Sequence, residues 1–150
     1  MRILIALLFV ALAGPSLGAS IGNQTTLTYD PGHGTQVEFV AANGTNYLWY
    51  PGNRIVLPGH WKLDGANICW SYPENSYNPV TGQTGSNWEC EPKSVYASTI
   101  VERAKGDVFG LAHRSAVPFK LSKTRTSIAA LSKLIRGTAA GMPAVRSGAN

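Results

Sequence analysis

The sequence predicts an all-β domain: an antiparallel meander that forms a small barrel or sandwich, followed by a C-terminal basic amphipathic helix. Stretches that favour strands recur about every 8–12 residues, and Gly, Pro, Asn and Asp separate them. Of the 150 residues, 44% are hydrophobic and 14% are charged. This length allows one domain, and this hydrophobic content excludes a wholly disordered chain.

The first 19 residues are predicted to be a secretory signal peptide. A positive charge at Arg2 precedes an unbroken apolar run over residues 3–13, and small residues follow up to Ala19. This order is typical of signal peptides. A membrane anchor is disfavoured, because crossing a bilayer takes roughly 20 apolar residues. We therefore expect cleavage after Gly18 or, preferably, Ala19, and an exported protein that is periplasmic or extracellular.

Turn signals divide the chain that follows into strands. Asn43-Gly44 and Asp64-Gly65 are typical of hairpin turns, and Pro51-Gly52 and Pro58-Gly59 are expected to end strands. The expected strands are residues 25–29, 36–41, 46–50, 54–57, 60–63 and 66–72, then a returning strand over 89–101 and a last candidate at 107–113.

Residues 73–87 are predicted to form a long loop, because they are rich in Asn, Gly, Ser and Pro and have no apolar period. Loops of this length in a compact domain are usually functional or mobile. Two interpretations stay open: a tethered hairpin connection without a further role, which is favoured, and a functional loop.

Cys69 and Cys90, the two cysteines of the chain, are expected to form a disulfide bond. In an oxidising compartment an isolated pair is most simply one bond. The chain-entropy model assigns roughly 3 kcal/mol to closing a loop of about 20 residues. A reactive thiol or half of a metal site is disfavoured, since neither cysteine belongs to a C-x-x-C motif.

The positive charge is concentrated near the C-terminus. Residues 111–150 contain seven basic and no acidic side chains, whereas residues 20–110 contain all eight acidic side chains and five basic ones. A helix is predicted over residues 126–136, capped by Thr124 or Thr126 and ended by Gly137. Its apolar residues fall close to one stripe, formed by Ile128, Leu131, Leu134 and Ile135.

Three interpretations of this tail are open. The stripe packs on the β-domain, which is favoured; or the helix lies on an anionic membrane surface; or the tail binds phosphate polymers. The side chains expected to attach to a surface are Lys120, Lys123, Arg125, Lys133 and Arg136. The predicted organisation is a signal peptide at 1–19, a β-domain at 20–113 and a basic tail with a short helix at 114–150.

The sequence predicts no enzyme activity, no cofactor and no metal site. His33, His60 and His113 stand on separate elements without a metal-ligand motif, and no G-x-S-x-G elbow is present. Glu89 and Glu91 share a strand face, and paired carboxylates can hydrolyse glycosides. A solvated sheet edge is the favoured interpretation of this pair.

The aromatic residues give the strongest indication of function, because all four tryptophans lie between residues 49 and 88. In strand 66–72, Trp70 and Tyr72 share one face and Cys69 lies on the other. In the favoured arrangement the rings fill the core and the disulfide lies at the surface. In the alternative, the rings form an exposed platform for a sugar or a partner. The expected ligand-binding residues are Trp49, Trp70, Tyr72, Tyr77 and Trp88.

The stretch PGHWKLDGANICWSY at residues 58–72, followed by W-E-C at 88–90, resembles a family of small secreted proteobacterial proteins. Members show G-x-W, then D-G, then C-[WF]-x-Y and a second cysteine. The similarity spans residues 25–111. It implies a calycin-like meander and an exported protein, and it carries over no activity, because none is established for the family.

Two functions are predicted. The first is an exported, barrel-like binding module for a small apolar molecule, a sugar or an exported enzyme. The alternative is a cell-envelope structural protein that attaches to anionic lipid or polymer through its basic tail. The expected partners are a cell-envelope protein, a glycan or an anionic membrane surface, and nucleic acid is disfavoured.

Overall fold

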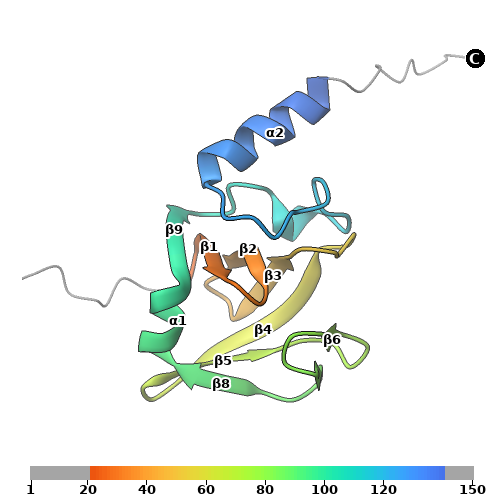
Figure 1. Cartoon of the computed structure of the whole chain (residues 1–150). Coiled ribbons are helices and arrows are strands. Elements are labelled where there is room, and N and C mark those ends of the chain that lie inside the picture. The colour runs from red at the N-terminus through yellow and green to blue at the C-terminus, as the bar shows by residue number, and fades with distance from the viewer. Residues whose placement is uncertain (1–20, 141–150) are drawn as a thin grey trace, which may run out of the picture.

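A seven-stranded antiparallel sheet dominates the computed structural model, which describes residues 21–140 (Figure 1). The strand order is β8-β5-β4-β3-β2-β1-β9, so the first five strands follow one another as a meander. The strands are β1 Gln24–Asp30, β2 Gly34–Val40, β3 Thr45–Trp49, β4 Leu57–Asp64, β5 Asn67–Ser71, β8 Glu89–Pro92 and β9 Ile100–Lys105. The predicted all-β meander is confirmed. The predicted signal peptide lies outside the described residues.

The two predicted hairpins are present. Asp64 pairs with Asn67, which leaves a two-residue loop that begins at Gly65 with φ of +57°. Between β2 and β3, Gly44 adopts φ of +85°, and the Asn43 side chain accepts a hydrogen bond from the Thr45 N–H. Glycine adopts positive φ without the steric cost that other residues meet. These local turn residues therefore set the register of the meander.

Pro58-Gly59 does not end a strand, contrary to the prediction. Both residues lie inside β4, and Pro58 pairs with Tyr47 of β3. The Trp61 N–H donates to Gly44 O on the β3 side at 2.9 Å, so the even-numbered N–H groups of β4 point toward β5. The pairing with β5 ends at His60, and Pro58 therefore lacks an N–H where no partner strand needs one. Of the expected strand at 54–57, Leu57 is the first residue of β4 and Ile55 forms an isolated bridge.

Two further strand predictions were wrong. Residues 89–101 form β8, the helix α1 (Lys93–Thr99) and β9, because Pro92 stands at the helix start, where a missing N–H costs little. Residues 107–113 form the short 3-10 helix η1 (Leu111–His113) instead of a strand. The Asp107 carboxylate accepts the N–H groups of Leu111 and Ala112, both at 2.8 Å, and this favours the helical turn.

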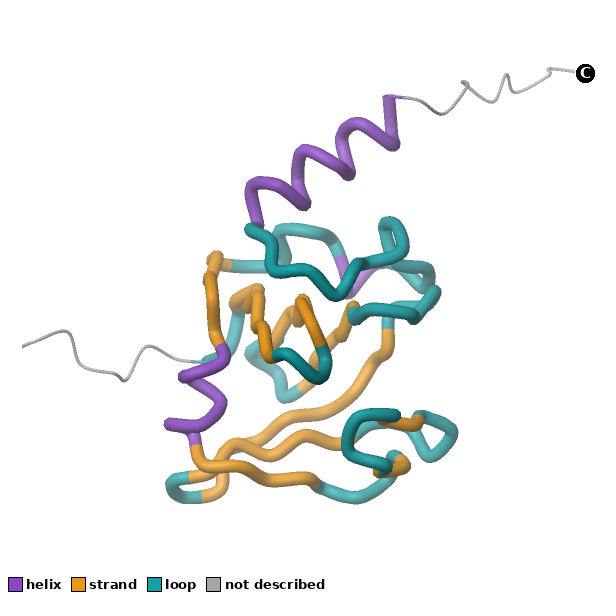
Figure 2. The backbone as a smooth tube through the Cα atoms, in the orientation of Figure 1, coloured by secondary structure: helices purple, strands orange, loops and turns teal. Residues whose placement is uncertain are grey.

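The sheet is curled into a half-barrel, and α1 connects its two edge strands (Figures 1 and 2). Glu38 of β2 accepts a hydrogen bond from Tyr72, which follows β5, three strands away in the sheet. Thr26 of β1 likewise contacts Tyr96 of α1. Side chains of strands so far apart in the sheet can meet only on its concave face. We define the concave face as the side of the sheet that carries Thr26, Glu38, Asn46, Trp70 and Tyr72.

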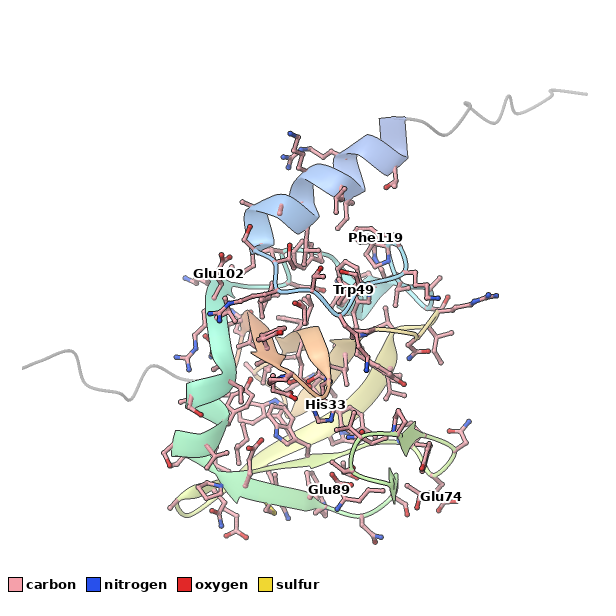
Figure 3. All side chains as sticks on the ribbon, viewed as in Figure 1. His33, Trp49, Glu74, Glu89, Glu102 and Phe119 are labelled. Atoms are coloured by element: carbon pink, nitrogen blue, oxygen red, sulfur yellow. A yellow bond between two sulfur atoms is a disulfide. The ribbon has the colours of Figure 1, made fainter. Side chains whose placement is uncertain are left out.

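The main hydrophobic core lies on the opposite, convex face of β1–β3. The loop-rich segment between β9 and α2 covers it (Figure 2). Trp49 packs edge-on against Phe119 with ring centroids 5.0 Å apart, and its Nε1–H donates to Phe119 O (Figure 3). The buried cluster consists of Leu27, Val37, Phe39, Trp49, Val56, Phe109, Leu111, Leu121 and Leu131.

The predicted C-terminal helix is confirmed as α2 (Ile128–Ala140). Its first turn is capped by Ser127 and by the Glu102 carboxylate of β9, which accepts the Ile128 N–H at 2.8 Å; the expected threonine caps do not form (Figure 3). Gly137 lies within the helix and does not end it. Leu131 is buried, and Ile128 and Ile135 pack against the core.

The predicted apolar stripe therefore docks on the β-domain for most of its length. Leu134 is the exception, with 53% of its surface exposed. The C-terminal half of α2 extends away from the body (Figure 1). No helix within residues 21–140 is both long and apolar enough to cross a membrane.

The disulfide between Cys69 and Cys90 is confirmed, and it joins directly opposed residues of β5 and β8. It lies on the convex side of β5, opposite Trp70, as strand parity predicts. Cys69 is buried and Cys90 is exposed. A bond of this kind is consistent with an oxidising, exported location.

Candidate functional site

Residues 73–87, which we call the flap, fold back beside the concave face instead of forming an open loop. They contain a small hairpin of β6 (Tyr77–Asn78) and β7 (Gln83–Thr84). The Gly85 N–H donates to Ser76 O at 3.0 Å, and the Ser86 N–H donates to Tyr72 O at 2.7 Å. A side chain at Gly85 would collide with the Pro73 carbonyl. The flap therefore has a defined shape of its own.

A cavity of about 120 Å³ lies between the flap and the concave face. Aromatic and aliphatic side chains make up most of its wall, and a few polar groups converge on it. The sheet side supplies Gln36, Leu48, Leu57, Trp70 and Glu89, with Tyr72 just beyond β5; the flap supplies Ser76, Tyr77, Asn78, Val80 and Gln83; His33, Tyr50 and Lys123 complete the rim. Most ligand sites share this composition.

Hydrogen bonds from behind hold the Tyr72 wall of the pocket. The Tyr72 hydroxyl donates to Glu38 Oε1 at 2.9 Å and accepts from Asn46 Nδ2 at 3.0 Å. Gly59 of β4 leaves the space that Tyr72 occupies, because a Cβ there would lie 2.7 Å from the Tyr72 ring. Gly59 therefore provides the space for the Tyr72 ring, and Glu38 and Asn46 fix its orientation.

Trp70 is held in a similar way from α1. The Tyr96 ring packs against it with centroids 5.3 Å apart, and the Tyr96 hydroxyl bonds to Thr26 Oγ1 at 3.1 Å. Burial raises the pKa of the Glu91 carboxyl, and the interaction of Glu91 with the Trp70 side chain opposes this rise. Glu89 and Glu91 lie on the edge strand β8, as expected, but both side chains are half-buried and Glu89 lines the pocket.

Glu38 is the buried residue behind the pocket wall that sequence reasoning missed. It is 7% exposed, and burial raises the pKa of its carboxyl from 4.5 to about 7 although hydrogen bonds from Asn46 and Tyr72 oppose the rise. Burial raises the pKa of Tyr72 and Tyr96 as well. The sequence does indicate a polar environment at this position, because Gln36 and Glu38 alternate with Val37 and Phe39. This alternation predicts a strand with one polar face.

Two side-chain contacts latch the flap to the sheet. The His33 ring bonds through Nδ1 to Asp30 Oδ2 at 2.9 Å, and Nε2 lies 3.3 Å from Asn78 Nδ2. The Asn78 oxygen accepts backbone N–H groups of the flap, so its amide nitrogen faces His33. Neutral His33 with its proton on Nδ1 satisfies both contacts. His33 was expected to stand alone, since the sequence gives no sign that the flap returns to it.

The second latch joins the flap to β8. With its amide nitrogen turned toward Glu89, Gln83 donates to the two carboxylate oxygens at 3.0 and 2.8 Å. His33 lies above the flap and Glu89 below it in the view of Figure 3. The flap is therefore held to the sheet at two points on the pocket wall.

Three of the five predicted ligand-binding residues line this pocket: Trp70, Tyr72 and Tyr77. Trp49 does not, because its odd position in β3 places it opposite Val37 and in the convex core. Trp88 also lies outside the cavity. Its ring is 44% exposed, and the Lys62 ammonium lies 4.3 Å from the ring centroid.

The predicted surface-attachment residues are all exposed. They are Lys120, Lys123, Arg125, Lys133 and Arg136. Lys123 reaches the pocket rim, where its Nζ donates to Gly32 O at 3.2 Å, and Arg125 lies over the Tyr29 ring. The structure thus brings only one of these cations to the candidate site.

Within residues 21–140, no group of three His, Cys, Asp or Glu side chains is arranged to hold a metal ion. Searches against protein-family models, curated proteins and solved structures found no match. The case for function therefore rests on the geometry of the pocket.

Proposed function

We propose that this protein is an exported binding module that holds a small, single-ring ligand between the concave face and the flap. The observation that carries the proposal is the cavity of about 120 Å³, whose Trp70 and Tyr72 walls are fixed from behind by Tyr96 and Glu38. Rigid supporting contacts of this kind are what a binding site needs to keep its geometry. A purely structural core would bury the same rings without leaving a cavity.

The size of the cavity selects among the predicted ligand types. A cavity of about 150 Å³ in another protein core accommodates benzene. This pocket, at about 120 Å³ and partly open to solvent, can therefore take at most one ring, part of which stays outside it, and not a long acyl chain. A segment of an enzyme could insert only one side chain. A small molecule, or the end of a polymer, is therefore the favoured ligand.

Export supports the same function. The predicted signal peptide and the disulfide between Cys69 and Cys90 favour a periplasmic or extracellular protein, in which a bond of about 3 kcal/mol helps a small domain to stay folded. The flap spans the residues between these two cysteines, so the bond also holds both ends of the flap.

Binding can be tested by NMR on the ¹⁵N-labelled full chain with single-ring probes. Indole, benzyl alcohol, methyl β-glucoside and N-acetylglucosamine are titrated separately. We expect at least one probe to shift the Trp70 indole N–H signal and the flap amides, while Trp49, whose indole N–H is bonded to Phe119 O, serves as the internal control. If no probe shifts Trp70 at millimolar concentration, the proposal is wrong.

The second candidate function is attachment to an anionic surface through the tail. The observation in its favour is that Leu134 is 53% exposed beside the exposed Lys133, so that α2 presents an apolar and a basic side chain to solvent together. Co-sedimentation with phosphatidylglycerol vesicles at 0.1 M and 1 M salt tests it, because the Debye length falls from about 10 Å to about 3 Å. Sedimentation at low salt that is lost at high salt supports it; no sedimentation at low salt excludes it.

A further inference from the structure

We infer that the ligand of this pocket is a neutral ring that carries several hydroxyl groups: one sugar residue, free or at the end of a glycan. This inference rests on the proposed function. It follows from three properties of the wall, namely an uncommitted amide, fixed aromatic faces and balanced charge.

The first property is the Gln36 side chain on the concave face. Gln36 lines the cavity together with Trp70, and its amide forms no hydrogen bond to another residue in the described part of the chain. An apolar ligand would remove this amide from water without offering a partner, which is unfavourable. A pair of neighbouring hydroxyl groups offers one donor and one acceptor, as an amide needs.

The second property is the set of fixed rings. The Tyr96 ring packs against the Trp70 indole, and Glu38 and Asn46 hold Tyr72. A sugar ring has an apolar face of C–H groups and a polar rim, so it can pack on an aromatic face and hydrogen-bond at its edge. The pocket pairs aromatic faces with a polar edge in the same way.

The third property is the balance of charge. Glu89 and Lys123 are the acidic and basic side chains on the pocket wall, and both are engaged, Glu89 by Gln83 and Lys123 by Gly32 O. Neither contact neutralises the charge of its group, so the wall carries one charge of each sign. This balance favours a neutral ligand over an anionic or a cationic one.

The experiment compares ring classes on the ¹⁵N-labelled full chain. Methyl β-glucoside and N-acetylglucosamine represent neutral sugars, indole and benzyl alcohol represent apolar rings, and benzoate and glucuronate represent anions. The readout is the Trp70 indole N–H, with Trp61, whose indole N–H is bonded to Ala41 O, as a silent reference. We expect at least one neutral sugar to shift Trp70 at lower concentration than any apolar or anionic probe.

A Gln36→Leu variant sharpens the comparison, because it keeps the volume and removes the amide. Sugar binding should weaken about tenfold, as the loss of one good hydrogen bond predicts, and indole binding should not weaken. Trp88→Phe, outside the cavity, is the matched control and should leave both affinities unchanged.

The outcomes separate this inference from the proposed function. If indole or benzyl alcohol shifts Trp70 and no sugar does, the inference is overturned and the binding pocket stands. If no probe of any class shifts Trp70, both are overturned. A sugar that binds Gln36→Leu as tightly as the unaltered chain also overturns the inference.

Discussion

Glu38 links the stability of the fold to the wall of the pocket. Burial raises the pKa of its carboxyl to about 7, so between pH 4.5 and 7 the folded protein keeps a proton that the unfolded chain has released. Stability should therefore fall as the pH rises through this window, by about 3 kcal/mol for a shift of this size. The half-buried Glu91, whose pKa burial also raises, acts in the same direction.

Glu38→Gln should remove most of this pH dependence. Glutamine can still accept the hydrogen bonds from Asn46 and Tyr72 through its oxygen, and it has no proton to lose. Urea unfolding at pH 5 and pH 8 measures the free energy of unfolding in both chains. We expect the variant to be more stable than the unaltered chain at pH 8 and similar at pH 5. An equal pH dependence in the two chains would show that Glu38 is not the titrating group.

Gly59 tests whether the space for Tyr72 is essential. A Cβ at this position would lie 2.7 Å from both Ser71 O and the Tyr72 ring, so Gly59→Ala should destabilise the protein by about 1–3 kcal/mol and displace Tyr72. Gly137→Ala is the control, because a Cβ at this position meets nothing within 4 Å. Since alanine favours a helix over glycine, this substitution should stabilise α2 by roughly 0.5–1 kcal/mol. Thermal unfolding of the two variants should shift in opposite directions.

At the residue scale the sequence predicted the disulfide from its single pair of cysteines, and it predicted three pocket residues from the clustering of its aromatic side chains. Strand parity correctly placed Trp70 on the face opposite Cys69. It placed Trp49 wrongly, because parity assigns a face but does not say which face curls inward. That choice is made by the contacts of Glu38 and Tyr96 with distant strands. A buried carboxylate was not expected, since only its tertiary partners make it tolerable.

The flap is the element that forms the outer wall of the pocket. Asn78 connects it to His33 and also accepts the Val80 and Thr81 N–H groups. Asn78→Ala should speed amide hydrogen exchange at Gly82 and Gly85 while changing the global stability by less than about 1 kcal/mol. Asn75→Ala, an exposed change in the same flap, should leave exchange unaltered. Equal exchange in both variants would show that the latch does not hold the flap.

The strand-turn pattern predicted most elements, and it failed where a residue acts differently in its tertiary context. Pro58 reads as a strand end, yet it lies inside β4 because β5 has already ended beside it. Val95 and Tyr96 favour strands, yet they form α1 because the chain must cross from β8 to β9 at opposite sheet edges. In both cases the arrangement of distant strands decides the local structure, and this arrangement cannot be read from the local propensity of the residues.

For the whole molecule, the disulfide is the main constraint outside the core. The bond joins Cys69 and Cys90, which are 21 positions apart in the sequence, and it closes the chain between them into a loop. A double Cys69→Ser, Cys90→Ser variant should lose roughly 3 kcal/mol of stability, as measured by urea unfolding without reductant. A variant as stable as the unaltered chain would show that β5–β8 pairing alone holds the flap ends.

The central claim is that the concave face and the flap together hold a ligand ring. Its most direct test is the set of intermolecular NOEs between the ring protons of a bound probe and the side chains of the ¹⁵N,¹³C-labelled chain. The account predicts NOEs to Trp70, Tyr72 and Tyr77, which line one cavity. NOEs to Trp88 and Lys62 in their place would put the ligand on the outer surface and contradict the account.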